Sequence, residues 1–192
     1  MNQPKQSFAF AAFFIFCLSL TTALAQTPPV TLSEPSFDIV LQTVVGSNDS
    51  GKTDVAPSLS GVIKKLKADF PFTNYRSVST FILKIKNKGS AGTRSVYFVT
   101  EKNLAVFPDW TIDDLTNSFD EKGQEAIQIR KFAFYQRIPI TSSNTAAVNY
   151  EQLGLTTGFS LAKNIPTVVG SLATSKPDEM MFLILTVRSA EK

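Results

Sequence analysis

Residues 37–45 read FDIVLQTVV, and this apolar, β-branched run decides the fold because it predicts the strand against which its neighbours must pack. A polar loop is expected at 46–56. We expect a helix to start after it, at Pro57 or Ser58, since proline suits a first helical turn, and to stop at Pro71. Its apolar residues recur at the spacing of one helix face: Leu59, Val62, Ile63, Leu66 and Phe70.

Patterns of period two follow the helix. Residues 78–86 (VSTFILKIK) and 94–100 (RSVYFVT) flank a glycine-bearing loop at 87–92, which predicts a β-hairpin. Residues 108–123 are acidic, and we expect them to be irregular, with one helical turn at 112–119. Residues 126–140 alternate, but the parity slips at Arg130 and Lys131, which indicates a β-bulge or a break between two strands. Further strands are expected at 146–150, 155–161, 167–172 and 180–188.

These elements predict the fold class. A strand–helix–strand unit followed by a run of strands is typical of one α+β domain with a mostly antiparallel sheet or sandwich, here spanning 36–192. Helix and strand do not alternate a second time, so a doubly wound fold is not expected. The apolar run at 180–187 is too short to span a bilayer and is expected to be a buried strand.

The first 25 residues have the features of a cleavable secretory signal. Lys5 supplies a positive charge, and residues 8–20 (FAFAAFFIFCLSL) are thirteen uncharged, mostly apolar residues, short for a membrane span. Ala23 and Ala25 are small, as signal peptidase requires. We expect a signal peptide at 1–25, an extended proline-bearing leader at 26–35 and a periplasmic or secreted product without a transmembrane span. An uncleaved anchor is the alternative.

Two residue types are almost missing from the chain. It has no histidine, which removes histidine triads, histidine zinc sites and the commonest general base. Its one cysteine, Cys17, lies in the expected signal, so the mature chain would have no disulfide and no thiolate site. Any enzyme would depend on carboxylates, lysine, tyrosine or serine.

Residues 46–53 (GSNDSGKT) match the phosphate-binding P-loop pattern after a predicted strand. In a true P-loop the helix begins near the Gly-Lys pair, but here Pro57 would fall inside that helix and cost about 3 kcal/mol. No later strand ends in a plausible magnesium-binding aspartate. We interpret the match as a polar loop that binds no nucleotide, and its pattern residues as coincidental: Gly46, Gly51, Lys52 and Thr53.

Charge is distributed unevenly. Residues 52–94 carry nine basic and two acidic side chains, which could form a face for an anionic envelope surface or an acidic patch on another envelope protein. The alternative is ordinary solvation of the helix and strands. Basic and aromatic residues interleave too sparsely to indicate nucleic acid. The candidate residues of this anionic-surface patch are Lys64, Lys65, Lys67, Lys84, Lys86 and Lys88.

The acidic stretch offers two further readings. Its spacing does not match a calcium-binding EF-hand, so no metal and no cofactor are expected. The same carboxylates could serve a hydrolase that uses two of them, although sequence cannot place two carboxyl groups at one bond. The residues concerned are Asp109, Asp113, Asp114, Asp120 and Glu121.

Two segments resemble known proteins. Residues 166–172 (PTVVGSL) followed by 181–187 (MFLILTV) are similar to the closing hairpin of outer-membrane secretins, with Ser171 in place of a second glycine. Residues 59–75, a helix running into FPFTNY, resemble small exported bacterial β-rich proteins of no assigned function. The resemblance implies β structure and an envelope location, and the chain is too short for secretin periplasmic modules plus a pore.

The sequence therefore favours an exported, non-catalytic binding or assembly protein of the cell envelope or secreted space. An exported hydrolase that depends on carboxylates is the alternative, and a nucleotide-binding protein is the third reading.

The signal segment yields a first prediction. We expect cleavage between Ala25 and Gln26, because small residues at 23 and 25 follow the apolar run. Intact mass and N-terminal sequencing of the exported protein measure this directly. An exported chain that still begins at Met1 would contradict it.

Overall fold

The computed structural model describes residues 34–99, 104–119, 121–140, 148–174, 176 and 178–190. The expected signal peptide and nearly all of the expected leader lie outside these residues. Contacts join the chain from Glu34 onward into one compact unit.

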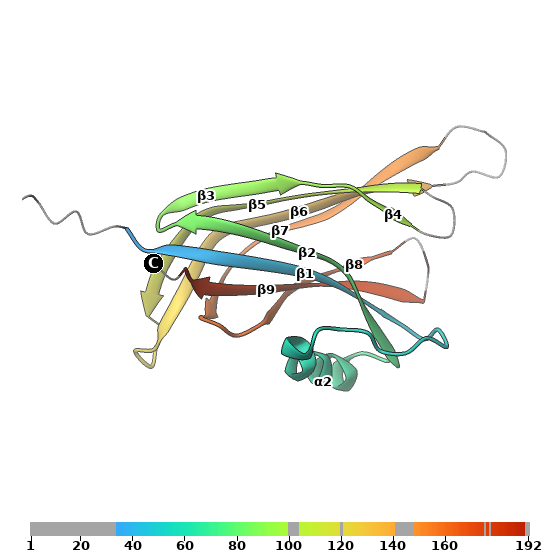
Figure 1. Ribbon diagram of the computed structural model, residues 1–192, viewed down its shortest axis with the longest axis horizontal. Helices are drawn as coiled ribbons and strands as arrows, with labels where there is room; N and C mark the ends of the chain where they lie inside the picture. The colour runs from blue at the N-terminus through green and yellow to red at the C-terminus, as the bar shows by residue number, and fades with distance from the viewer. Residues whose placement is uncertain are drawn as a thin grey trace, which may run out of the picture. The chain divides into compact units, whose positions relative to one another are not determined.

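Two antiparallel sheets lie face to face, with one short helix on the far side of the first sheet (Figure 1). The first sheet has the order β2-β1-β9-β8, and the second has the order β3-β5-β6-β7, with β4 also paired to β5. No helix in the described part of the chain is long and apolar enough to cross a membrane. The elements are β1 (Ser36–Ser47), η1 (Pro57–Leu59), α2 (Ser60–Asp69), β2 (Asn74–Lys86), β3 (Gly89–Arg94), β4 (Tyr97–Val99), β5 (Leu104–Phe119), β6 (Glu125–Ile140), β7 (Asn149–Ala162), β8 (Thr167–Ala173) and β9 (Glu179–Ser189).

Several predictions from sequence are confirmed. The 37–45 run is β1, a central strand that pairs with both β2 and β9. The strands expected at 167–172 and 180–188 are β8 and β9, which form an antiparallel pair. The described chain is nevertheless mostly β, so it contains less helix than the expected α+β class implies.

The expected hairpin between 78–86 and 94–100 is wrong. β2 pairs with β1, whereas β3 and β4 pair with β5 in the other sheet. Residues 87 and 88 instead carry the chain from one sheet to the other, where Lys88 adopts a φ of 58° and donates its backbone N–H to the Leu115 carbonyl at 2.7 Å. Alternation predicted that these segments are strands, but a local pattern does not specify which partner a strand takes.

The expected irregular segment with a helical turn at 112–119 is also wrong. This region is the long strand β5, in which Trp110 and Ile112 are buried while Asp109 and Asp113 lie on the other face. The acidic residues therefore occupy the solvent side of an alternating strand. Similarly, the two short strands expected at 146–150 and 155–161 form one strand, β7.

The bulge expected at Arg130 and Lys131 is confirmed. The register between β6 and β7 shifts between Ile129 and Phe132. On the other side of β6, Asp114 adopts a φ of 55° and accepts a hydrogen bond from Arg130 Nε at 3.0 Å. The irregularity thus extends across two neighbouring strands.

The main core fills the space between the sheets. Alternate residues of β1 and β9 meet alternate residues of β5 and β6, as period-two side chains in a sandwich require. Trp110 packs beside Phe81 of the first sheet and Phe132 of the second, with ring centroids 6.3 Å apart in each pair. The buried members include Phe37, Ile39, Leu41, Trp110, Ile112, Ile127, Phe132, Phe134, Leu183, Leu185 and Val187.

The helix covers part of the outer face of the first sheet. Leu59, Val62, Ile63 and Leu66 pack there against Phe182 and Ile184, which point away from the main core. The predicted helix face is therefore confirmed, with Phe70 half-buried at its end. Because β9 is covered on both faces at this level, its sequence is a continuous apolar run without alternation.

This packing predicts that Leu66→Ala lowers the free energy of unfolding by about 2–5 kcal/mol, the usual cost of truncating a fully buried leucine. Leu66 is 3% exposed, so the cavity that truncation leaves would be closed off from solvent. Urea denaturation measures the change, and Lys65→Ala on the exposed face is the matched control. An unchanged denaturation midpoint in Leu66→Ala would mean that the helix does not dock through this face.

Candidate functional site

The outer face of the second sheet carries a row of large polar and aromatic side chains. They occupy alternate positions on adjacent strands, so cross-strand pairing places them side by side. Phe107 of β5 lies opposite Arg137 of β6, which lies opposite Gln152 of β7. In the next row, Asp109 of β5 lies between Arg94 and Tyr135.

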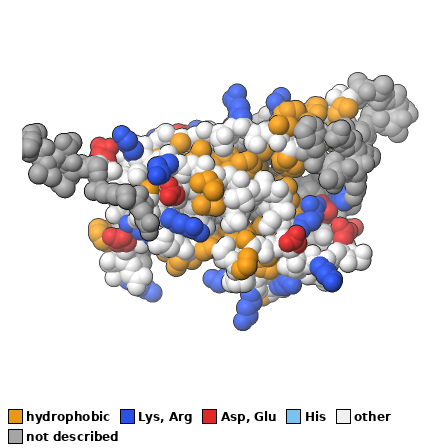
Figure 2. All heavy atoms as spheres, viewed as in Figure 1, with side chains coloured by type: hydrophobic (Ala, Val, Ile, Leu, Met, Phe, Trp, Pro, Cys, Tyr) orange, Lys and Arg blue, Asp and Glu red, His pale blue; other side chains and the backbone are white. Residues whose placement is uncertain are grey.

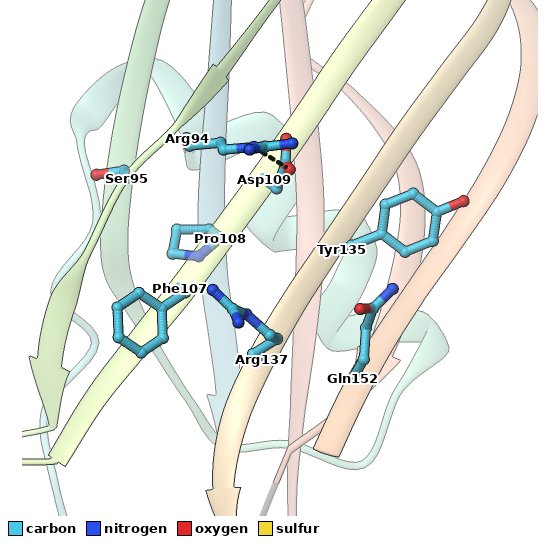
Figure 3. A pocket seen from close by; sticks show the side chains of 8 residues that line it. All are labelled: Arg94, Ser95, Phe107, Pro108, Asp109, Tyr135, Arg137 and Gln152. Carbon is cyan, nitrogen blue, oxygen red and sulfur yellow. Dashed lines mark hydrogen bonds and ion pairs between the residues drawn. The ribbon is translucent and has the colours of Figure 1, made fainter. Parts of the chain in front are cut away.

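These rows enclose a shallow hollow of about 450 Å³, here called the outer groove (Figure 3). Its walls come from the end of β3 with the residue after it, and from β5, β6 and β7, so segments far apart in the sequence position its side chains. The residues that line it are Arg94, Ser95, Phe107, Pro108, Asp109, Tyr135, Arg137 and Gln152.

An ion pair closes one end of the outer groove. Arg94 Nε lies 2.7 Å from Asp109 Oδ2, and the arginine side chain is 86% exposed. An exposed pair of this kind adds at most about 1 kcal/mol to stability. It does hold the Asp109 carboxylate and the Arg94 guanidinium in fixed positions at the surface.

At the other end, a guanidinium rests on an aromatic ring. Arg137 Cζ lies 5.0 Å from the centroid of the Phe107 ring, within the range of a cation–π contact. The Tyr150 ring packs edge-on against Phe107 at 5.6 Å. In the described ranges no carboxylate pairs with Arg137, so its guanidinium donors are available to a ligand.

Tyr135 forms the third side. An ideal Cβ on Gly154 would lie 2.2 Å from Tyr135 Cδ1, so the ring covers Gly154 of the neighbouring strand. The Tyr135 hydroxyl is hydrogen bonded to Thr156 Oγ1 at 2.8 Å. These contacts hold the ring against the sheet while it stays 38% exposed. Glycine at position 154 is required because any side chain there would displace the ring.

The chemistry of the groove suits binding. It offers guanidinium and amide donors, one carboxylate and aromatic surface, but no paired carboxylates for acid–base work. Tyr97 is a strongly shifted group in the described chain: burial raises its pKa to about 12, and the Arg76 guanidinium opposes this shift. Its hydroxyl donates to Gln136 Oε1 at 3.4 Å, and Gln136 is buried on the inner face of β6, so this phenol is not part of the groove.

The P-loop match does not place Lys52 and Thr53 at the start of a helix. Gly46 belongs to β1, and an ideal Cβ there would lie 2.8 Å from the Phe72 ring, which explains the glycine by packing. The helical segment starts at Pro57, as the sequence predicted, so the N–H groups of a helix N-terminus lie beyond the motif. Gly51 and Lys52 are exposed in the intervening loop.

The candidate lysines fall into two groups. Lys64, Lys65 and Lys67 are exposed on α2, whose buried side packs near Tyr75 at the start of β2. Lys84 and Lys86 lie at the other end of β2. At 3.3 Å per residue, Lys84 is about 30 Å along the strand from Tyr75, and Lys88 lies in the turn beyond. Figure 2 shows basic side chains spread over the visible face. The structure does not bring the six lysines together.

Three of the five acidic candidates form ion pairs. Asp109 pairs with Arg94, Asp113 lies 3.8 Å from Lys131, and Asp114 lies 3.0 Å from Arg130. Asp120 lies outside the described residues, and Glu121 is exposed in the turn before β6. Within the described ranges, no three Asp, Glu, Cys or His side chains gather where they could hold a metal ion.

Sequence reasoning missed the outer groove. Its residues come from β3 to β7, and only the register of these strands brings them together. A signal was present in the alternation of Phe107 and Asp109 with buried residues, but the acidic composition of the segment led to an irregular prediction.

Comparison with solved structures finds secretins at low similarity. The Salmonella type III secretion injectisome secretin InvG is 11% identical with a TM-score of 0.41, and the match covers 96% of this chain and 66% of that one. The Vibrio cholerae type IV competence pilus secretin PilQ is 10% identical with a TM-score of 0.41, covering 96% and 65%. A chain of the Klebsiella pneumoniae type II secretion outer membrane complex is 9% identical with a TM-score of 0.39, covering 96% and 43%.

This chain therefore spans less than two thirds of the length of these three neighbours. The likeness to these three structures is one of β-rich architecture. No protein-family model and no curated protein matches the sequence.

The loop geometry at 46–53 predicts that ATP and GTP do not bind and that Lys52→Ala changes nothing measurable. In a true P-loop this lysine contacts the β and γ phosphates, so its removal abolishes binding. Isothermal titration calorimetry with and without magnesium provides the test. Magnesium-dependent binding in the micromolar range that Lys52→Ala removes would overturn this interpretation.

Proposed function

We propose that this chain is an exported, non-catalytic binding or assembly protein of the cell envelope or secreted space, and that it holds a macromolecular partner in the outer groove. One observation carries the proposal: the Arg137 guanidinium, which pairs with no carboxylate among the described residues, converges with two aromatic rings and the Gln152 amide in one surface hollow. Arginine and tyrosine are among the residues most enriched at the energetic centres of protein interfaces.

The geometry also supports a preformed site. Stacking on Phe107 holds Arg137, and Thr156 and Gly154 hold Tyr135. Side chains already ordered before binding lose less conformational entropy when the partner arrives. The export part of the proposal is supported by the signal-like sequence at 1–25.

The alternative of a carboxylate-dependent hydrolase gains no support from the groove. Its one carboxylate, Asp109, is bound to Arg94 and has no second carboxylate as partner among the lining residues. A glycoside hydrolase requires two carboxyl groups on either side of the scissile bond.

Attachment to an anionic surface is a second candidate. Lys64, Lys65 and Lys67 are exposed on α2, and none of them has an ion-pair partner in the described part of the chain. Such a helix face would be attracted to anionic headgroups, and the attraction would weaken above about 0.15 M salt. The lysines of β2 would contribute separately.

The groove proposal predicts that a photo-cross-linking amino acid in place of Tyr135 captures one discrete partner in expressing cells, whereas the same group in place of Ile82 on the first sheet does not. Arg137→Ala should reduce the adduct about thirtyfold, the equivalent of a 2 kcal/mol interface residue. Arg130→Ala is the matched control, because it removes an exposed arginine from the same strand outside the groove.

Equal loss in both arginine variants, or the same adducts from positions 135 and 82, would reject the groove. Co-sedimentation with anionic vesicles separates the second candidate. Binding that high salt and a Lys64, Lys65 and Lys67→Glu triple variant both abolish, while Arg137→Ala leaves it unchanged, would assign the contact to α2.

A further inference from the structure

The sheet edges of this protein differ in how they are protected. A free edge strand exposes backbone N–H and C=O groups that can pair with another chain, and proteins block such edges with charges, proline, bulges, short strands or covering segments. The edges here are β2 and β8 in the first sheet, and β3 with β4 and β7 in the second.

Three of these edges carry such devices. The edge of β2 is covered at one end by Asp54, whose backbone forms a β-bridge with Arg76. Lys84 and Lys86 are exposed towards the other end. Strands β3 and β4 are six and three residues long. β8 has seven residues and is bulged, and Pro166 directly precedes it.

Among the described residues, β7 has only one such device, the charged Glu151 near its start. It is fourteen residues long, and from Gln152 to Ala162 it contains no charge and no proline. The one extra residue of the nearby bulge belongs to β6, where Arg130 and Lys131 stand against Gly158 alone. In the described ranges no backbone hydrogen bond reaches β7 from any strand other than β6.

In the described part of the chain, β8 of the other sheet contacts β7 but does not pair with it. β8 approaches β7 where the Leu155 side chain lies against Gly170, so the contact is made from the inner face. The two strands belong to different sheets and form no ladder. Figure 1 shows the start of β7 separate from β8.

We propose that β7 pairs antiparallel with β7 of a second copy of this chain, with the two-fold axis at Thr157, which joins the second sheets of the two copies. In this register the inner-face side chains are self-complementary. Leu155 faces Phe159 of the second copy, and Leu153 faces Leu161 of the second copy. Leu153, Leu155 and Phe159 are only half-buried in one copy, so pairing completes their burial.

The charges at the ends of the strand fit the same register. Glu151, the only charge in β7, lies opposite Lys163 of the second copy, directly after that strand. Lys163 already donates to Glu125 at 2.6 Å, and because an ammonium group has three donors it can also donate to a second carboxylate. A foreign strand would need to supply both complementary features, whereas a second copy supplies them by symmetry.

Because the chain has a single native cysteine, replacing it leaves a background in which introduced cysteines can test the register. In a Cys17→Ser background, Thr157→Cys places two thiols across the axis, where opposite Cα atoms lie about 4.5–5.5 Å apart, within disulfide range. Ser160→Cys is the matched control on the same strand, since its two copies would be about 20 Å apart. Under mild oxidation, the full chain purified after export should give at least tenfold more linked dimer for Thr157→Cys.

Sedimentation of the unmodified chain supplies an independent measurement that does not depend on either cysteine variant. It should show a concentration-dependent dimer, and Thr157→Lys, which opposes two ammonium groups, should raise the dissociation constant at least tenfold relative to Thr157→Ser. A monomer at every concentration, or equal cross-linking through Ser160→Cys, would overturn the proposal. Thr157 lies outside the outer groove, so failure here is separate from failure of the proposed function.

Discussion

Face-to-face burial of two alternating sheets is the constraint on which the rest of this structure depends. Trp110 is 1% exposed between Phe81 and Phe132, yet its Nε1 has no hydrogen-bond partner among the described residues. An unsatisfied buried donor costs about 1–3 kcal/mol. Burying an aromatic side chain of about 200 Å² contributes about 5 kcal/mol at 25 cal/mol/Å², so packing outweighs the lost hydrogen bond. Shape complementarity between the sheets therefore dominates local polar satisfaction.

The helix solves a problem that the sandwich creates. Central strands β1 and β9 present apolar side chains on both faces, because Phe182 and Ile184 alternate with the inward Leu183 and Leu185. The second sheet covers only one face, so α2 must cover part of the other. Phe182 contacts the Phe70 ring at a centroid distance of 4.8 Å and the Phe72 ring at 6.3 Å, directly over Gly46. A side chain at position 46 would displace these rings, which accounts for a glycine whose match to the P-loop pattern was interpreted as coincidental.

What the sequence predicts depends on how local the determinant is. The helix face, the β1 strand and the bulge at Arg130 were predictable because periodicity, and its interruption, are contained in one segment. Strand partners were not, since the crossing at Lys88 is fixed by a bond to the distant Leu115 carbonyl. The outer groove was missed for the same reason: Phe107, Arg137 and Gln152 become neighbours only through the register of three strands.

The two surfaces proposed for binding follow from this division of roles. Inner-face residues are fixed by the core, whereas alternate residues such as Arg137 and Tyr135 lie outside the core and can be selected for a ligand. β7 links both surfaces, because Gln152 and Gly154 border the groove while Leu153 and Leu155 line the half-covered inner edge. Extending the sheet at β7 would leave the outer face uncovered. Two copies would then present their grooves on the same side of one continuous sheet, and a repeating or two-fold symmetric partner would contact both at once, with a gain in affinity that comes from geometry rather than from new contacts.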